Sequence, residues 1–326
     1  MTNYSRLGYE IKRDFTNFSL KISKCLKRPQ EKFIHQMIYG ILAGNKLHLS
    51  EIARSLKENI TLKKTIDRLS RNLNAFRDQD SLMHNFTLVK RHVKEDYAII
   101  IIDNSDIAKP ASRKLEALSE IRDISTGEVT QGCLTIDAAV LSEKGKMPLP
   151  VYEKVFSASE KGFISETHEN LCCLKSLSKN FTPKCVRTLD RGFDANDYYR
   201  YFLKRGERFI IRAKKNRNVI YNGQTCNIMD VALRYKGACR MDFKDKKERA
   251  IQCKMSCIPV RLCELPSKDL VLTVVYGFGE EPTLLLSNLK MQEKKNCATS
   301  SPKYICSSGV LRNISGSRNS SLNWKI

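Results

Sequence analysis

The sequence predicts an α/β protein, in which an all-helical N-terminal domain precedes a core built on a mixed β-sheet. Up to about residue 92, apolar residues recur at spacings of three and four, which is typical of amphipathic helices. From Tyr97 onward the pattern changes to short runs of β-branched residues with helical segments between some of them. Residues 218–285 are again rich in predicted strands, which indicates a β-rich insertion before the chain returns to the core.

Two of the predicted N-terminal helices follow each other closely. Ser50 is a good N-cap for the first, and Thr61 is a capping candidate for the second, which runs to Leu73. A short helix followed by a basic one resembles a helix-turn-helix. It predicts that the second helix contacts DNA; the alternative is an ordinary amphipathic pair with a solvated basic face. The predicted DNA contacts in this helix are Lys63, Lys64 and Arg68.

The strongest strand signal is the isoleucine run at residues 99–102, which ends in Asp103. Four consecutive β-branched residues are typical of a strand that is covered on both faces. We therefore predict a strand at 97–103 with Asp103 at its carboxyl end, where open α/β folds build their sites. Further strands are predicted at 132–141, 151–157, 185–190 and 208–212, and helices at 166–177 and 197–204.

The predicted order β-β-β-α-β-α-β is that of a ribonuclease H-like core. In that fold one aspartate lies on the central first strand and a second ends the fourth strand beside it, and Asp103 and Asp190 occupy these places. Carboxylate oxygens are ligands for hard ions such as Mg²⁺. Two such ions stabilise charge on the attacking and leaving oxygens of a phosphodiester, and a minimal site of this kind has three carboxylates. The structural alternative is that these aspartates cap helices, or that Asp190 and Asp194 pair with Arg191.

The chain is strongly basic, with 57 Lys and Arg against 35 Asp and Glu and a net charge of +22. This surplus favours a polyanionic partner, with nucleic acid first and an anionic membrane surface second. Tyr198 to Phe202 interleave with cations and could stack on unpaired bases, although core packing is the favoured interpretation. The cations predicted to contact DNA backbone near Asp190 are Arg191, Arg212, Lys214, Lys215 and Arg217.

The sequence gives little support for a zinc site, disulfides, a membrane span or a signal peptide. The 12 cysteines are scattered and form no C-x-x-C pair, so we expect free thiols rather than a zinc site or disulfides. No run approaches the roughly 18 to 20 apolar residues that cross a bilayer. The N-terminus has no apolar signal-peptide core. We therefore expect a soluble, intracellular protein without a membrane partner.

Three segments carry a resemblance to a known family: Asp103–Pro110, Asp190–Asp194 and Phe209–Arg217. They resemble the DDE transposases of bacterial insertion sequences, of the cut-and-paste type with a β-rich insertion, over about residues 95–290. The resemblance implies a ribonuclease H-like fold, Mg²⁺ or Mn²⁺, and a cytoplasmic, nucleoid-associated homodimer on double-stranded DNA at element ends and targets. It also implies DNA cleavage and strand transfer, with Asp103 and Asp190 as the first two catalytic and metal-binding carboxylates.

The chain departs from this family where a third carboxylate is expected, in a Tyr-x2-Arg-x3-Glu-x6-Lys signature on a helix after the insertion. Residues 296–326 contain no Asp or Glu and show no periodicity. Back-translated codons, read in a shifted frame, restore a Tyr, an Ile-Glu and a Phe-Lys-Lys, with the Glu encoded across Leu311 and Arg312. We therefore interpret the tail as frameshifted. Glu166, or Glu280 with Glu281, is the disfavoured substitute.

On this interpretation the chain has no third catalytic Glu, and this copy of a transposase is impaired. The alternatives are a catalytically dead remnant that binds DNA and inhibits intact copies, or a ribonuclease H-like nuclease. The predicted domains are a helical DNA-binding domain at 1–92, the first part of the core at 93–217, the β-rich insertion and return to the core at 218–290, and an aberrant tail at 291–326.

Overall fold

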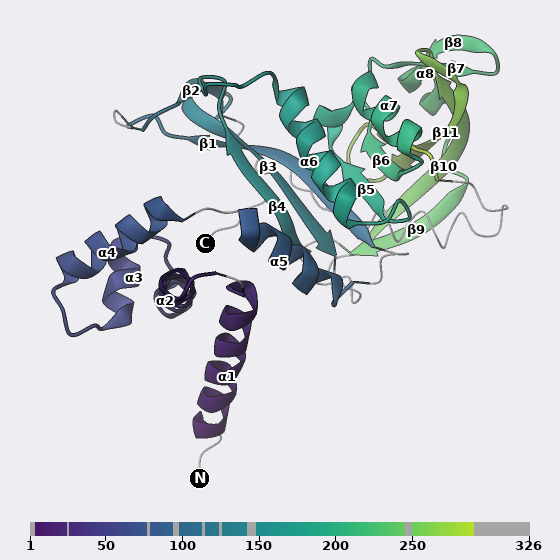
Figure 1. The fold of residues 1–326 in the computed structure, drawn as a ribbon. Helices are drawn as coiled ribbons and strands as arrows, with labels where there is room; N and C mark the ends of the chain where they lie inside the picture. Colours follow the sequence, from purple (N-terminus) through teal and green to yellow (C-terminus); the bar gives the residue numbers. More distant parts are fainter. Residues whose placement is uncertain are drawn as a thin grey trace. The chain divides into compact units, whose positions relative to one another are not determined.

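The computed structural model describes residues 4–24, 26–76, 79–93, 98–112, 115–123, 126–141, 148–244 and 250–289. The chain divides into two compact units, of which one ends at His92 and the other begins at Val93. The predicted tail at 291–326 lies outside the described residues. Figure 1 shows a helical unit and a sheet unit.

The first unit is helical. Its elements are α1 (Tyr4–Ile22), α2 (Arg28–Gly44), α3 (Leu49–Leu56), α4 (Leu62–Ala75) and α5 (Gln79–Lys90). Phe33, Ile52, Ala53 and Leu69 form the core between α2, α3 and α4. Within the described part of the chain, no helix is long and apolar enough to span a membrane.

The helix starts differ in detail from the prediction. The N-cap of α3 is His48, so Ser50 lies in the first turn of this helix and does not cap it. Thr61 is the N-cap residue of α4, as predicted, but its side chain makes no capping hydrogen bond. Packing of the apolar faces, rather than side-chain capping, therefore fixes these two helices.

The second unit is built on one large sheet. Its strands are β1 (Ile99–Ala108), β2 (Ser119–Arg122), β3 (Val129–Leu141), β4 (Pro148–Phe156), β5 (Val186–Leu189), β6 (Arg208–Arg212), β7 (Asn218–Tyr221), β8 (Gln224–Asn227), β9 (Cys239–Lys244), β10 (Ala250–Leu262), β11 (Leu265–Tyr276) and β12 (Thr283–Ser287). Its helices are α6 (Glu166–Asn180), α7 (Asn196–Arg205), α8 (Ile228–Leu233) and the 3₁₀ turn η2 (Arg191–Phe193). The strands and helices that were predicted individually are all present, whereas β2, η2 and α8 were not predicted, and β7 to β10 were predicted only as a β-rich stretch.

The strands hydrogen-bond in the order β2-β3-β1-β5-β6-β12-β11-β10-β7-β8, while β4 pairs with β3 and β9 pairs with β10. The pairs β1–β5 and β5–β6 are parallel. The remaining pairs are antiparallel, so the sheet is mixed but mostly antiparallel. The β-rich insertion belongs to this same sheet, because β12 lies between β6 and β11 and joins the insertion to the core.

Helices α6 and α7 lie over one face of the sheet (Figure 1). The rings of Tyr199 and Phe202 on α7 pack on Phe209 of β6, with centroids 5.7 and 5.3 Å apart. Tyr198, Tyr199 and Phe202 are buried. Most of the aromatics that interleave with cations therefore pack in the core, which confirms the interpretation favoured from the sequence. These rings are not available to stack on bases.

The first predicted strand ends in a different place. We expected it to stop at Asp103, but β1 continues to Ala108. Its parallel pairing with β5 stops at Ile102 opposite Leu189, whereas its antiparallel pairing with β3 continues to Ala108 opposite Gly132. The polar residues after Asp103 are thus paired with β3 and no longer with β5. Asp103 lies in the middle of a strand, at the point where that strand parts from β5.

Candidate active site

Asp103 and Asp190 come together where two parallel strands separate. Ile102 and Leu189 are the last paired residues of β1 and β5, and the two aspartates are the residues that follow them. On its other side Asp103 is the direct partner of Asp137 on β3. Residues that face each other across paired strands point to the same side of a sheet. Asp137 and Asp103 therefore point to one face, and Asp190, whose charge acts on Asp103, completes a row of three aspartates.

An arginine extends this row. Ile211 of β6 pairs with Leu189, and Arg212 follows it just as Asp190 follows Leu189. Nη1 of Arg212 lies 3.7 Å from Oδ1 of Asp190. The arginine thus offsets part of the negative charge at the Asp190 end of the row, where the carboxylate is 55% exposed.

The electrostatics of the row differ from one aspartate to the next. Burial raises the pKa of Asp103 to about 7, and the neighbouring charges of Asp190 and Asp137 add to this effect. Burial also raises the pKa of Asp137, although a hydrogen bond of 2.9 Å from Oγ1 of Thr135 opposes the shift. Desolvation and like charge both disfavour an ionised carboxylate. A cation bound to these aspartates would therefore stabilise their ionised form.

Local sequence explains why Asp190 is open and Asp103 is not. All four residues of β5 are buried, so Asp190 is the first exposed residue after a strand covered on both faces. The chain then turns through η2, whose Phe193 is buried and anchors the turn. Asp103 is flanked by β3 and so stays half-buried.

Asp137 was not singled out in the sequence. The available signal is a lone carboxylate in the apolar run Leu134–Leu141, where alternation places it on the face opposite Ile136 and Ala138. Because Ile136 and Ala138 are buried, this alternation leaves Asp137 beside Asp103.

The donor set is suited in part to a divalent metal. Two adjacent carboxylates that repel each other supply the hard oxygen ligands that Mg²⁺ and Mn²⁺ prefer, and Mg²⁺ usually keeps several waters. Among the residues that the structure describes, however, no group of three or more His, Cys, Asp or Glu side chains is arranged to hold a metal ion. Asp103 and Asp190 therefore suit a metal ion only if water or substrate oxygens supply its remaining ligands.

Exposed cations surround the Asp190 end of the row. Arg191 follows Asp190 directly, and Lys214 and Lys215 lie on the turn that follows β6; all three are exposed. The ammonium of Lys215 pairs with Glu281. Cations in this position can contact phosphates without reading bases.

Two further predicted DNA contacts, Arg217 and Arg68, also have partners within the protein. Arg217 forms an ion pair with Asp194, and its side chain is 13% exposed. Arg68 binds Oε2 of Glu58 at 2.6 Å and Oε1 of Gln36 at 2.7 Å, so it ties α4 to the preceding loop and to α2. Both arginines hold protein segments together. In contrast, Lys63 and Lys64 are exposed on the first turn of α4.

Two of the three disfavoured substitutes for a third carboxylate, Glu166 and Glu281, also have partners. Oε1 of Glu166 accepts a hydrogen bond of 2.8 Å from Nδ2 of Asn104. Asn104 is adjacent to Asp103 but points to the opposite face of β1, because successive strand residues alternate. Glu281 pairs with Lys215.

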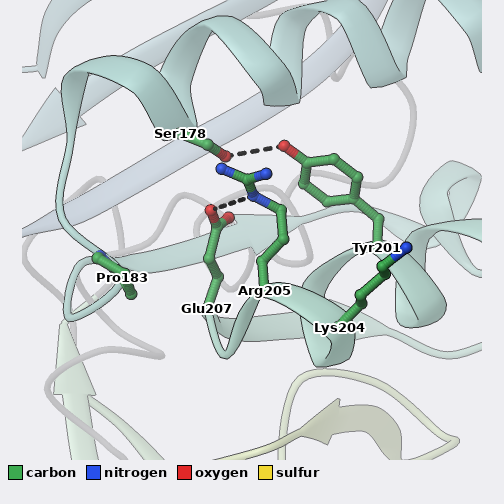
Figure 2. Close-up of a pocket in the computed structure, with 6 residues that line it drawn as sticks. All are labelled: Ser178, Pro183, Tyr201, Lys204, Arg205 and Glu207. Carbon is green, nitrogen blue, oxygen red and sulfur yellow. Dashed lines mark hydrogen bonds and ion pairs between the residues drawn. The ribbon is translucent and has the colours of Figure 1, made fainter.

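Figure 2 shows a separate hollow, which none of these carboxylates lines. It is lined by Ser178, Pro183, Tyr201, Lys204, Arg205 and Glu207. Pro183 precedes β5 and Glu207 precedes β6, so the hollow lies at the amino ends of these strands, whereas Asp190 follows the carboxyl end of β5.

The charged groups at this hollow form ion pairs, although Oε2 of Glu207 and Nη2 of Arg187 make no hydrogen bond within the described residues. Oε1 of Glu207 lies 3.0 Å from Nε of Arg205, and Oε2 lies 3.5 Å from Nε of the buried Arg187. Burial lowers the pKa of Arg187, and Glu207 opposes this shift. This arginine–carboxylate–arginine group joins β5, α7 and the residue that precedes β6.

Comparisons with known proteins give partial structural likenesses. No protein-family model matches the chain, and no curated protein matches it. Among solved structures, the chain is similar to a piggyBac transposase synaptic complex with hairpin DNA, with a TM-score of 0.44 and 13% identity over 92% of this chain and 63% of that chain. It is also similar to Ciona intestinalis endonuclease V in complex with a 24mer DNA, with a TM-score of 0.29 and 14% identity over 69% and 86% of the two chains. The NurA nuclease of Sulfolobus solfataricus gives a TM-score of 0.27 and 8% identity over 82% and 86% of the two chains.

Proposed function

We propose that this chain is a DNA-processing enzyme of the DDE transposase class, with a ribonuclease H-like core. The order β4-β3-β1-β5-β6 supports the core assignment, because β1 is central, β3 and β4 run antiparallel on one side, and β5 and β6 run parallel on the other. The resemblance in the Asp190–Asp194 segment supports the class.

One observation carries this proposal: Asp103 and Asp190 follow the last paired residues of two adjacent parallel strands, where burial first and the charge of Asp190 second raise the pKa of Asp103. Carboxylates brought together against their mutual repulsion are typical of sites that bind cations or transfer protons. A divalent metal bound there would stabilise negative charge on the oxygens of a phosphodiester.

The residues around the aspartates have separable roles in this proposal. Asp190 is exposed and can meet a metal or substrate from solvent, while the half-buried Asp103 forms the wall of the site. Arg212 holds the Asp190 carboxylate from the side of β6. Arg191 and Lys214 bind backbone phosphates, and Lys63 and Lys64 on α4 contact DNA separately.

The test is an assay of cleavage and strand transfer on double-stranded DNA that carries the sequences flanking the gene, with Mg²⁺ or Mn²⁺. We expect metal-dependent cleavage that Asp190→Ala abolishes. DNA affinity should stay equal or rise in this variant, because it removes a negative charge near phosphate. Cleavage that Asp190→Ala retains would refute the site assignment.

A second candidate is a DNA-binding remnant that no longer cleaves. One observation favours it: the described residues hold no group of three carboxylate, His or Cys ligands. On this alternative the wild type binds element ends and forms mixed dimers that inhibit an intact transposase, but cleaves nothing with either metal. Cleavage without strand transfer would instead favour a ribonuclease H-like nuclease.

A further inference from the structure

Asp194 is the most completely partnered carboxylate near the site. Its side chain is 0% exposed. Oδ1 accepts a hydrogen bond of 2.8 Å from the hydroxyl of Tyr199 and lies 2.5 Å from Nε of Arg217. Oδ2 accepts a bond of 2.6 Å from the main-chain N–H of Lys214. One side chain thus contacts both α7 and the turn that follows β6.

Arg217 completes the connection from the other side. Its Nη2 donates to the main-chain oxygen of Asp194 at 3.1 Å, and its Nη1 donates to Oδ1 of Asn196 at 3.0 Å. Its guanidinium also lies over the ring of Tyr199, 5.1 Å from the centroid. The planar fork of arginine makes these contacts together, and lysine could not replace it.

The two segments joined in this way carry the groups of the proposed site. Asp190 is joined to Asp194 through the η2 turn, in which the main-chain N–H of Phe193 donates to the main-chain oxygen of Asp190 at 3.0 Å. Lys214 and Lys215 project from the turn whose backbone Asp194 holds. A shift of either segment would change the position of Asp190 relative to the cationic turn.

We infer that Asp194 and Arg217 are a positioning pair, which fixes the Asp190 carboxylate relative to the turn that binds substrate phosphate. The inference rests on the proposed function, because it assigns the Lys214–Arg217 turn to the DNA backbone and Asp190 to the metal. Neither residue of the pair touches the reacting atoms. A misplacement of about 1 Å at a catalytic group can lower a rate by about a hundredfold.

The test compares Asp194→Asn and Arg217→Lys with Tyr198→Phe in the full chain. Tyr198 is a matched control, because it is buried on α7 next to Tyr199, which contacts Asp194. The hydroxyl of Tyr198 accepts a hydrogen bond of 3.0 Å from Asn170, which is outside the pair. All measurements are made at a temperature where circular dichroism shows each variant folded. Amide exchange is measured for residues 190–196 and 213–217, and single-turnover cleavage is measured at saturating DNA.

In Asp194→Asn and Arg217→Lys we expect exchange to rise in these two segments and cleavage to fall by about tenfold or more. DNA affinity should change by less than about threefold, since the exposed cations remain. Tyr198→Phe should cleave at the wild-type rate. Wild-type cleavage in Asp194→Asn despite loosened segments, or an equal loss in Tyr198→Phe, would overturn the positioning role.

A separate readout covers a wild type that does not cleave. That result would refute the proposed function as an enzyme, and Mn²⁺ affinity, measured by electron paramagnetic resonance, then decides on the pair. We expect Asp194→Asn to weaken Mn²⁺ binding by about fivefold or more, while Tyr198→Phe leaves it unchanged, because metal sites need fixed ligand geometry. Equal affinity in Asp194→Asn and the wild type, or no Mn²⁺ binding by the wild type, would refute the pair as well.

Discussion

Replacing Asp103 with asparagine should remove most of a pH dependence of stability from the metal-free protein. The pKa of Asp103 is raised from 3.8 to about 7 in the folded state. Between these two values the folded state binds a proton that the unfolded state releases. The stability that protonated Asp103 contributes is therefore fully present below about pH 4, and it is lost as pH rises from there through about 7.

The size of this effect follows from the shift. Each pKa unit corresponds to about 1.4 kcal/mol, so a change from 3.8 to about 7 corresponds to a total of about 4 kcal/mol. About 3 kcal/mol of this falls between pH 5 and pH 8, because stability changes only while the folded and unfolded states differ in bound protons. Asp103→Asn stays neutral, so it should keep this stability at pH 8 in the presence of EDTA.

The assay is urea unfolding at pH 5 and pH 8 in EDTA, followed by circular dichroism, with separate transitions fitted for the helical unit and the sheet unit. Asp106→Asn is the control, because it removes the same charge from β1 three residues further along. The reasoning is wrong if the wild type and Asp103→Asn lose the same free energy of unfolding between the two pH values.

Three further predictions concern metal, DNA and the helical core. At pH 8, Mn²⁺ at a hundred times its Kd should stabilise the wild type by about 2.7 kcal/mol in thermal unfolding, and should leave Asp190→Ala unchanged. Lys214→Ala should lower the slope of log affinity against log salt by about 0.9 in anisotropy titrations; a loss on one DNA sequence alone would contradict a phosphate contact. Leu69→Ala, at a site with 0% exposure, should cost the helical unit about 2–5 kcal/mol in urea unfolding. A cost well below this range would mean that Leu69 is not central to its core.

The strands that sequence predicted best are those with continuous apolar runs. Ile99–Ile102, Arg208–Arg212 and Thr283–Leu286 all lie in strands of the central sheet. The short strand β2 (Ser119–Arg122) was missed, because four residues with two exposed side chains give little periodic signal. The end of the first strand was misplaced for a different reason, since residues 104–106 have low β-propensity and are held by pairing with β3.

The site was predictable from the sequence only where strand ends and strand order place its residues. The pairing of Asp103 with Asp190 followed from strand ends and topology, and the structure brings them to adjacent strands. Ion pairs between distant segments gave no signal. Adjacency in sequence suggests Arg191 as the partner of Asp190 and Asp194, but they pair with Arg212 and Arg217, which follow in sequence by more than 20 residues. Side-chain partners across loops depend on tertiary packing, which a single sequence does not encode locally.

The position of β12 has a consequence for how this chain folds. All five residues of β12 are buried, and it pairs with β6 on one side and β11 on the other. Until residue 287 has been synthesised, one edge of β6 therefore lacks its partner strand. That edge belongs to the apolar run Phe209–Ile211, which makes it a template for pairing with other chains. Contacts so distant in sequence also slow folding. We expect chains truncated before Thr283 to aggregate, although they already contain both Asp103 and Asp190.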